Sequence, residues 1–352
     1  MAVYALWNNK GGVGKSYLTF QIASEYARTH RDQNVLVIDM CPQSNSSIMF
    51  LGGMINGESN LDGIAAASPR YTIAGYMESR IQSPYTSPQV GASYAVQVST
   101  YNNFITPNLY LVVGDEELEL QASRVARAAV PGPPDAWRIV HLWLSDLISD
   151  IRHSWNASDS TVFIDCNPSF TIYTELALSA ADRLIIPFSA DGSSKRAVRT
   201  VLSLIYGIMR TPGGVQSEFY TNSLRWRMSV PAIYYYIGNR LTQMNYSSAS
   251  AFKTVVTEIG TEIWNVWRNN PNHFCIHPTG AGAPATRLDF RRMFQAEIND
   301  ANTASVVSGA LGVPMSVLTP GEKNVAGRSI SVNQSQLDRQ KPNIRDFVSR
   351  IE

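Results

Sequence analysis

A glycine-rich segment near the start of the chain carries the residue types that bind phosphate groups. It reads Lys10-Gly11-Gly12-Val13-Gly14-Lys15-Ser16 and is followed by Tyr17. Glycines allow backbone N–H groups to turn inward around phosphate oxygens, and a helix that follows such a loop points its positive end at them. Lys15 would neutralise the outer phosphates, and the Ser16 hydroxyl is suited to bind Mg²⁺. We therefore predict that ATP and magnesium bind here, with nucleotide contacts from Gly11, Gly12, Val13, Gly14, Lys15, Ser16 and Tyr17.

The segment differs from the strict P-loop pattern in one respect. That pattern has a glycine five positions before the second glycine, and in this chain the position holds Asn9. The closing Gly-Lys-Ser is kept, and the other glycines lie inside the loop, next to an extra lysine, Lys10. Phosphate binding should be unaffected, because it depends on backbone N–H groups and on Lys15.

The elements around this loop are those that such a site requires. Residues 3–7 form a short apolar run that predicts a buried strand, and residues 16–28 follow a helical period. A second apolar run, residues 35–38, ends at Asp39. Strand, glycine-rich turn, helix and strand make a βαβ unit, which predicts a parallel sheet.

The same alternation continues along most of the chain. Further apolar runs lie at 109–113, 161–164, 184–186 and 230–237, and helical patterns lie at 116–129, 135–151, 193–209 and 249–267. We expect an α/β fold with a doubly wound, mostly parallel sheet flanked by helices, formed by residues 1–352 as a single domain. Residues 52–108, which are rich in Gly, Ser, Pro and Tyr, are predicted to be an insertion, and residues 333–352 a C-terminal helical segment.

The loop with its extra lysine resembles the deviant Walker A box of the ParA/MinD family of P-loop ATPases, and of ParA-type partition proteins in particular. Three other segments share this resemblance. Residues 35–45 (VLVIDMCPQSN) are similar to the family's second strand and switch I, and residues 162–169 (VFIDCNPS) resemble its Walker B strand. Residues 108–119 are similar to a strand, loop and helix common in ParA proteins.

The resemblance implies roles for individual residues. Lys10 would reach across an ATP-bound homodimer to the phosphates of the partner, and Lys10, Lys15 and Asp39 would be the catalytic residues. Ser16, Asp39 and Asp165 would act at the magnesium, the carboxylates through water, because Mg²⁺ tends to keep several waters. Asn239, which follows an apolar strand, would contact adenine.

One position departs from the family pattern. The family usually has Asp-x-Asp-Pro-Gln in switch I, where the second Asp helps to position the attacking water, and this chain has Cys41 there. A thiol with an ordinary pKa of about 8.5 is mostly neutral at pH 7 and accepts hydrogen bonds weakly. Losing a water-orienting group typically costs about 10²–10⁴ in rate. We therefore expect slow or partner-stimulated hydrolysis, unless another group such as Asp39 orients the water.

The function that the resemblance implies is partition or positioning of a plasmid, chromosome or other large cargo. The ATPase would dimerise on ATP, bind DNA non-specifically, and be stimulated by a ParB-like partner or cargo adaptor. It would be cytoplasmic and associated with the nucleoid. DNA contacts would come from surface cations and depend steeply on salt; the candidates are Lys195, Arg196, Arg199 and Arg345.

Composition limits the other classes of function. The 352 residues are 44% hydrophobic and 16% charged, which is typical of globular proteins. A net charge of +1 means that DNA must be bound by a local patch. The three cysteines lack zinc-site spacing. No apolar run reaches the length of a membrane span, so we expect no membrane partner.

Three other functions stay open. A MinD-like membrane-surface regulator would need an amphipathic anchor, for which the C-terminal segment is a poor candidate because it mixes acidic and basic residues. A metabolic P-loop enzyme would need a substrate pocket, which residues 52–108 could supply. A nucleotide-dependent scaffold with little turnover would follow from Cys41. DNA retention that depends on ATP separates the partition function from the first two, and phosphate release separates it from the third.

Overall fold

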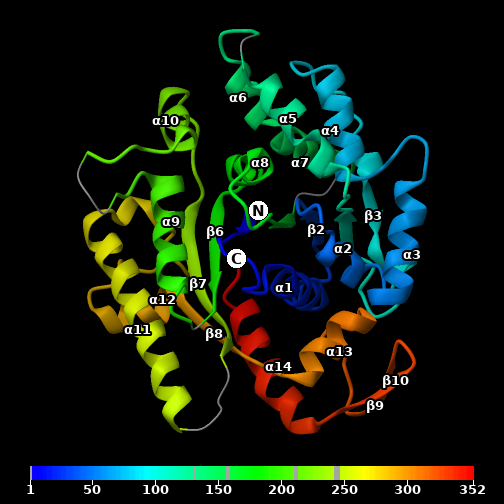
Figure 1. The fold of residues 1–352 in the computed structure, drawn as a ribbon, viewed down its shortest axis with the longest axis vertical. Helices are drawn as coiled ribbons and strands as arrows, with labels where there is room; N and C mark the ends of the chain where they lie inside the picture. The colour runs from blue at the N-terminus through cyan, green and yellow to red at the C-terminus, as the bar shows by residue number, and fades with distance from the viewer. Residues whose placement is uncertain (1, 131, 156–158, 190, 210–212, 242–245) are drawn as a thin grey trace.

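A central sheet of eight strands, with helices on both faces, makes up the body of the protein (Figure 1). The computed structural model describes residues 2–130, 132–155, 159–189, 191–209, 213–241 and 246–352. The strand order is β3-β4-β2-β5-β1-β6-β7-β8; β3 runs antiparallel to β4, and all the other neighbours are parallel. The strands are β1 (Val3–Leu6), β2 (Asn34–Asp39), β3 (Ala95–Gln97), β4 (Leu109–Val112), β5 (Ser160–Asp165), β6 (Arg183–Phe188), β7 (Ala232–Leu241) and β8 (Gln295–Asn299). This confirms the predicted α/β fold.

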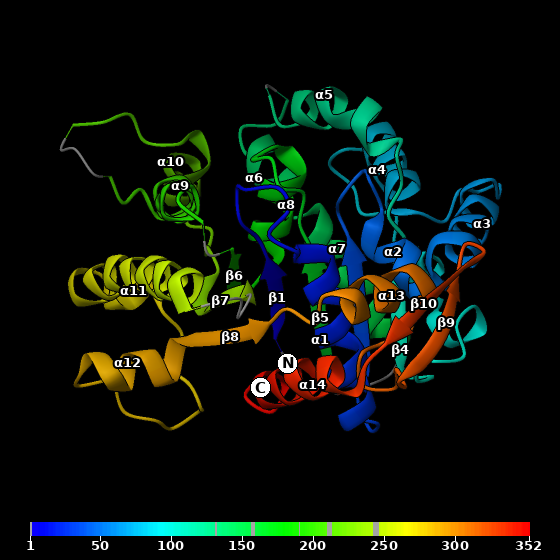
Figure 2. The same cartoon turned by 60° about the horizontal axis from the view of Figure 1, so that its bottom comes forward.

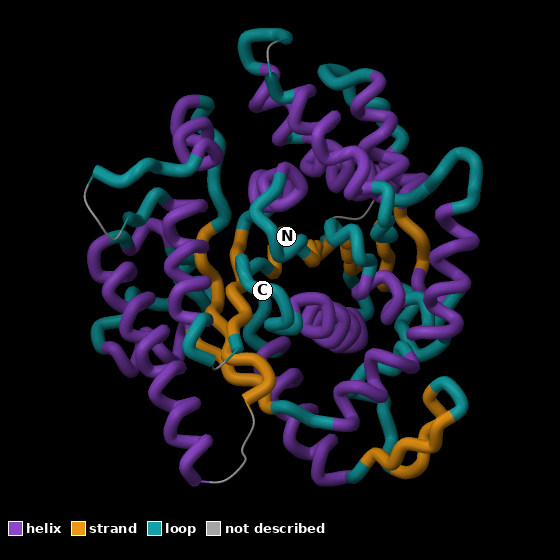
Figure 3. The backbone as a smooth tube through the Cα atoms, in the orientation of Figure 1, coloured by secondary structure: helices purple, strands orange, loops and turns teal. Residues whose placement is uncertain are grey.

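Most of the remaining chain is helical. The helices are α1 (Lys15–Thr29), α2 (Asn45–Phe50), α3 (Gly53–Ala65), α4 (Ile73–Gln82), α5 (Leu118–Ala128), α6 (Ala136–His141), α7 (Trp143–Ser154), α8 (Ile172–Ala180), α9 (Ser194–Tyr206), α10 (Glu218–Arg225), α11 (Tyr246–Asn269), α12 (Arg287–Phe294), α13 (Thr303–Leu311) and α14 (Gln334–Val348), with short 3₁₀ turns at Gly91–Tyr94, Val98–Thr100 and Pro271–His273. A separate hairpin of β9 (Gly321–Val325) and β10 (Arg328–Val332) lies apart from the main sheet, next to α13 (Figure 3).

The central strands are apolar on both sides, because each side supports its own layer of helices. In β1, Tyr4 and Leu6 pack with α1, α13 and α14, whereas Val3 and Ala5 pack with helices of the opposite layer, such as α7 and α8. All four side chains are buried. Figure 2 shows the first layer in front of the sheet. Continuous apolar strands of this kind are typical of parallel sheets covered on both faces.

Parts of the chain differ in detail from the sequence prediction. The helix expected over 135–151 is two helices that meet at Leu142. Residues 52–108 contain helices α3 and α4 and add the antiparallel strand β3 to the sheet edge. Ile73 and Met77 of this segment are fully buried in the core. The segment therefore packs as part of the main body.

The last helix, α14, lies within the C-terminal helical segment predicted over residues 333–352. Its buried residues, which include Ile344 and Phe347, pack against the layer formed by α1. No helix in the described part of the chain is both long and apolar enough to cross a bilayer.

The fold brings three loops together at one edge of the sheet. Strands β2, β5 and β1 are adjacent and parallel, so their carboxyl ends meet. The loop after β1 leads into α1, the loop after β2 is the switch I segment, and Asp165 ends β5. Ligands of doubly wound sheets bind in the crevice at these carboxyl ends.

Candidate nucleotide-binding site

The glycine-rich loop joins β1 to α1 in a conformation that depends on its glycines. Gly12 has a φ of +75° and Gly14 a φ of +82°, in the left-handed region that favours glycine. Gly14 precedes α1, whose first N–H groups receive no side-chain cap and so are available to a ligand. Asn8 fixes the start of the loop: its amide donates to the Pro187 carbonyl oxygen (2.7 Å), and its Oδ1 accepts from the Lys10 N–H (3.0 Å).

Lys15 lies inside this loop. Its ammonium donates to the backbone oxygens of Lys10 (3.1 Å) and Asn8 (3.3 Å). Burial lowers the pKa of Lys15, and the nearby Asp165 carboxylate opposes that shift. A buried cation whose present partners are neutral carbonyls is suited to exchange them for phosphate oxygens, which attract it more strongly.

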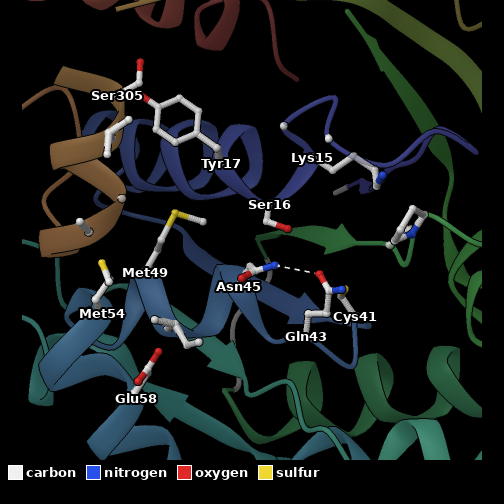
Figure 4. Close-up of a pocket in the computed structure, with 18 residues that line it drawn as sticks. Lys15, Ser16, Tyr17, Cys41, Gln43, Asn45, Met49, Met54, Glu58 and Ser305 are labelled. Atoms are coloured by element: carbon white, nitrogen blue, oxygen red, sulfur yellow. Dashed lines mark hydrogen bonds between the residues drawn. The ribbon is translucent and has the colours of Figure 1, made fainter. Parts of the chain in front are cut away.

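A cavity of about 510 Å³ opens beside the loop, a volume within the usual range of small-molecule sites. Figure 4 shows Lys15 and Ser16 at one end of it and Met49, Met54 and Glu58 at the other. Tyr17 lies on the wall between these ends, and its hydroxyl donates to Gln340 of α14 (2.6 Å). The structure thus brings Gly12, Gly14, Lys15, Ser16 and Tyr17 together around one nucleotide-sized cavity.

Asp39, at the end of β2, is fully buried and hydrogen-bonded within its own segment. Its carboxylate accepts from the Ser47 N–H (3.0 Å), the Ser47 hydroxyl (2.7 Å) and the Cys41 N–H (3.0 Å). Burial raises the pKa of Asp39, and these donors oppose the rise. A side chain at Gly114 would lie 2.8 Å from the Asp39 carboxyl carbon, so the close approach of β4 requires glycine. The Asp39 carboxylate therefore links the switch I segment to the start of α2 through these hydrogen bonds.

Asp165 ends β5 directly beside Asp39, and the two residues are register partners. It is fully buried, and neither carboxylate oxygen accepts a hydrogen bond of standard geometry from a described residue. Burial raises its pKa to about 7, and the Asp39 charge adds to the rise, whereas the Ser16 and Ser46 hydroxyls and the Lys15 ammonium oppose it. A buried carboxylate without partners is costly unless a cation or proton compensates it. These residues therefore fit Mg²⁺, which Asp165 and the Ser16 hydroxyl would hold.

Cys41 faces the same cavity from switch I. It is 5% exposed, and burial with the neighbouring Asp39 and Asp165 carboxylates raises the pKa of its thiol to about 12. Burial also raises the pKa of Cys166, the residue after Asp165. Both thiols are therefore neutral, so neither can act as a base at pH 7. The polar side chains of Gln43 and Asn45 also line the cavity and are hydrogen-bonded to each other (3.2 Å; Figure 4).

Lys10 and Asn239, which were predicted to contact the nucleotide, form hydrogen bonds or ion pairs with residues of the same chain. The Lys10 ammonium forms an ion pair with Asp191 and also donates to Ser189. Asn239 is buried, and its amide donates to the Val13 backbone oxygen (2.8 Å), which ties the loop to the end of β7. Its Oδ1 has no hydrogen-bond partner among the described residues.

The candidate DNA-binding residues differ in whether a carboxylate forms an ion pair with them. Lys195 pairs with Glu258 (3.0 Å), Arg199 with Glu262 (2.7 Å), and Arg345 lies 3.7 Å from Glu25. Arg196 is exposed and forms no ion pair with any residue that the structure describes. It is therefore the candidate most available to a phosphate.

Several residues that shape the site were not predicted from the sequence. Asn8, Ser47 and Asp191 each hold a predicted residue in place. Ser47 had a local signal, since two serines follow switch I directly. Asp191 had none, because it is 181 positions from Lys10.

Comparison with known proteins places the chain in a family. The model of a family described as an AAA domain matches residues 1–212. The chromosome partitioning protein ParA of Caulobacter vibrioides is 26% identical over 194 residues, which cover 54% of this chain and 57% of that protein. The match thus spans little more than half the length of that relative.

Solved structures show the same fold. The ATP complex of a McdA variant from Cyanothece has a TM-score of 0.58 at 14% identity and covers 100% of this chain and 98% of that one. The structure of pNOB8 ParA has a TM-score of 0.50 at 16% identity, over 84% of this chain and 81% of that one. The family model covers more than half of the chain, and the P-loop and the paired aspartates at the ends of β2 and β5 lie within the matched residues: the chain belongs to this AAA domain family.

Proposed function

We propose that this protein is a partition or positioning ATPase that binds ATP with Mg²⁺ at residues 10–17 and forms a homodimer in that state. The dimer would bind DNA non-specifically and carry or position a large cargo, such as a plasmid or chromosome. The observation that carries the proposal is the buried carboxylate of Asp165, which accepts no hydrogen bond of standard geometry from a described residue and lies beside Lys15 and Ser16. The similar protein ParA of Caulobacter vibrioides is a chromosome partitioning protein. This similarity supports the proposal that the dimer binds DNA and positions a large cargo.

The residues would divide the work of the site between binding and orientation. Lys15 and the loop N–H groups would hold the phosphates, and Asn239 would fix the loop through Val13 and offer its free Oδ1 to the base. Bound Mg²⁺ would stabilise charge that develops on the phosphate oxygens. Asp39 would act at the magnesium only indirectly, because its oxygens are engaged by Ser47 and Cys41.

Turnover would be slow in the protein alone. Cys41 is a neutral thiol, and the Asp39 carboxylate is already bonded, so neither is suited to orient water. Gln43 and Asn45 are polar side chains of switch I that line the cavity, and we assign Gln43 the weaker role of water orientation. A ParB-like partner or cargo adaptor would then supply the stimulation, in the cytoplasm and at the nucleoid.

A second candidate function is a nucleotide-dependent scaffold with little turnover. The neutral Cys41 thiol favours it specifically, because such a protein needs ATP binding but no water-orienting group.

The experiment that tests the proposal measures DNA binding with ATP, with ADP and without nucleotide, at two salt concentrations, alongside phosphate release. Lys15→Ala serves as the control that removes nucleotide binding. Salt-sensitive DNA binding that requires ATP is expected, with slow phosphate release. ATP-dependent DNA binding without any phosphate release would favour the scaffold. Absence of DNA binding in every nucleotide state would refute the partition function.

A further inference from the structure

The Lys10 ammonium is fully occupied by acceptors of its own protomer. It forms an ion pair with Asp191 and donates to the Ser189 hydroxyl (3.1 Å) and the Ser194 hydroxyl (3.4 Å). A lysine ammonium has three donors, so this cluster of three acceptors satisfies all of them. The Lys10 side chain is accordingly only 24% exposed, although it stands in a surface loop.

Asp191 is itself well supported by donors other than Lys10. Its carboxylate accepts from the Ser189 hydroxyl (2.7 Å), the Ser193 N–H (3.0 Å) and the Ser193 hydroxyl (2.8 Å). It also lies just before α9, whose N-terminal end favours negative charge. Burial works to raise the pKa of Asp191, but the hydrogen bonds from Lys10, Ser189 and Ser193 outweigh it and lower that pKa. Asp191 therefore stays a satisfied anion after Lys10 departs.

We propose that Asp191 is a positioning residue that holds Lys10 in its own protomer and competes with the phosphates of a partner protomer for the same ammonium. The inference rests on the proposed function, in which Lys10 crosses the dimer interface. Dimer formation must break the Lys10–Asp191 ion pair in each protomer, so the pair raises the ATP concentration at which dimers form.

The same cluster connects Lys10 to α9. Ser194 is the first residue of that helix and is completely buried. Lys195, the next residue, and Arg199, one turn further along, are paired with Glu258 and Glu262 of α11. Release of Lys10 would therefore remove one hydrogen-bond donor from the start of the helix that presents the candidate DNA-binding cations.

The test compares wild type with Asp191→Asn, which removes the charge but keeps an oxygen that accepts from Ser193. The ATP concentration for half-maximal dimerisation, measured by sedimentation at fixed protein concentration, is expected to fall about two- to fivefold, the range of a partly exposed ion pair. Ser189→Ala should shift it less, in the same direction. Glu258→Gln is the matched control, because it frees Lys195 from a comparable ion pair and should leave the threshold unchanged.

A second readout does not depend on dimerisation. Acylation of Lys10 by an N-hydroxysuccinimide ester, followed by peptide mass spectrometry in the absence of nucleotide, is expected to be faster in Asp191→Asn than in wild type or Glu258→Gln. Equal acylation rates with an unchanged threshold would overturn the inference. Faster acylation in a protein that never dimerises with ATP would instead support the Asp191 contact and refute the proposed dimer. Circular dichroism would verify that the variants are folded.

Discussion

Asp39 and Asp165 are register partners at the ends of neighbouring parallel strands, yet they have opposite hydrogen-bonding states. Asp39 accepts three hydrogen bonds from residues of switch I and α2, whereas both oxygens of Asp165 lack a partner among the described residues. The first carboxylate therefore has a structural role, and the second is available to a cation.

This difference predicts opposite effects of matched substitutions. Asp39→Asn should lower the free energy of unfolding by about 1–3 kcal/mol, because buried donors lose their charged acceptor. Asp165→Asn should not destabilise the apo protein, because it removes a desolvated charge, but should abolish the Mg²⁺ dependence of ATP binding. Chemical denaturation and ATP titration with and without Mg²⁺ measure the two effects. A large loss of stability in Asp165→Asn would contradict the assignment.

Restoring a carboxylate at Cys41 should accelerate hydrolysis. Cys41→Asp places an acceptor in the cavity at the position where the family has its water-orienting Asp, and a gain of about 100-fold in phosphate release is expected, at the lower end of the range for such groups. Cys41→Ser is the control for size and should stay slow. The prediction fails if both variants release phosphate at the wild-type rate while they still bind ATP.

The contact between Arg70, which precedes α4, and Asp115, which follows β4, should make the stability of the protein sensitive to acid; Arg70 also forms an ion pair with Glu117 (2.8 Å). Arg70 donates to both oxygens of the buried Asp115 (2.5 and 2.7 Å), which also accepts from Thr72 at the start of α4. Burial opposes ionisation of Asp115, but these donors outweigh it and hold its pKa below the usual value. The stabilisation is therefore complete above the unfolded pKa of about 4 and is lost as the pH falls through the lower folded value.

Arg70→Ala tests this pair. At pH 7 it should lower the free energy of unfolding by about 2 kcal/mol, because a buried carboxylate loses a charged donor. The difference from wild type should shrink below about pH 4. Denaturation series at several pH values measure it, and a difference independent of pH down to pH 2 would count against the ion pair.

Arg196 should contribute more to DNA binding than its neighbours on α9. Lys195 and Arg199 are paired with glutamates, whereas Arg196 has no ion pair within the described residues. Arg196→Ala should weaken ATP-dependent DNA binding and reduce the slope of log affinity against log salt by about one unit. Lys195→Ala should have a smaller effect, and Glu258→Gln should strengthen binding. Equal losses for Arg196→Ala and Lys195→Ala would show that the ion pairs do not matter.

The parts of the site that could be predicted from sequence are those whose chemistry is local. The loop at 10–17 and its flanking strand and helix are contiguous, and the positions of Asp39 and Asp165 follow from the strands that they end. Contacts between segments that are distant in the sequence could not be predicted in this way. The partners of Lys10 and Asn239 are 181 and 226 positions away, so no local pattern indicated them.

The fold was predicted most reliably where strands are apolar on both faces. The strands at the two edges of the sheet were not predicted, because they are not apolar on both faces. Strand β8 has only two buried residues among five, and β3 has three half-buried residues. The insertion over residues 52–108 stays a prediction, but its Gly, Ser and Pro content gave no sign that Ile73 and Met77 would lie in the core.

The hydrogen bonds that α1 makes with distant parts of the chain affect when the protein can fold during synthesis. Tyr17 bonds to Gln340, and Gln21 bonds to Ser308 and to the Met315 N–H, all buried. The nucleotide loop and α1 precede these partners by 287 to 323 positions, so α1 obtains them only after residues 308–340 have been synthesised. Such long-range closure slows folding, so competence to bind ATP would arise only after residue 340 has been added.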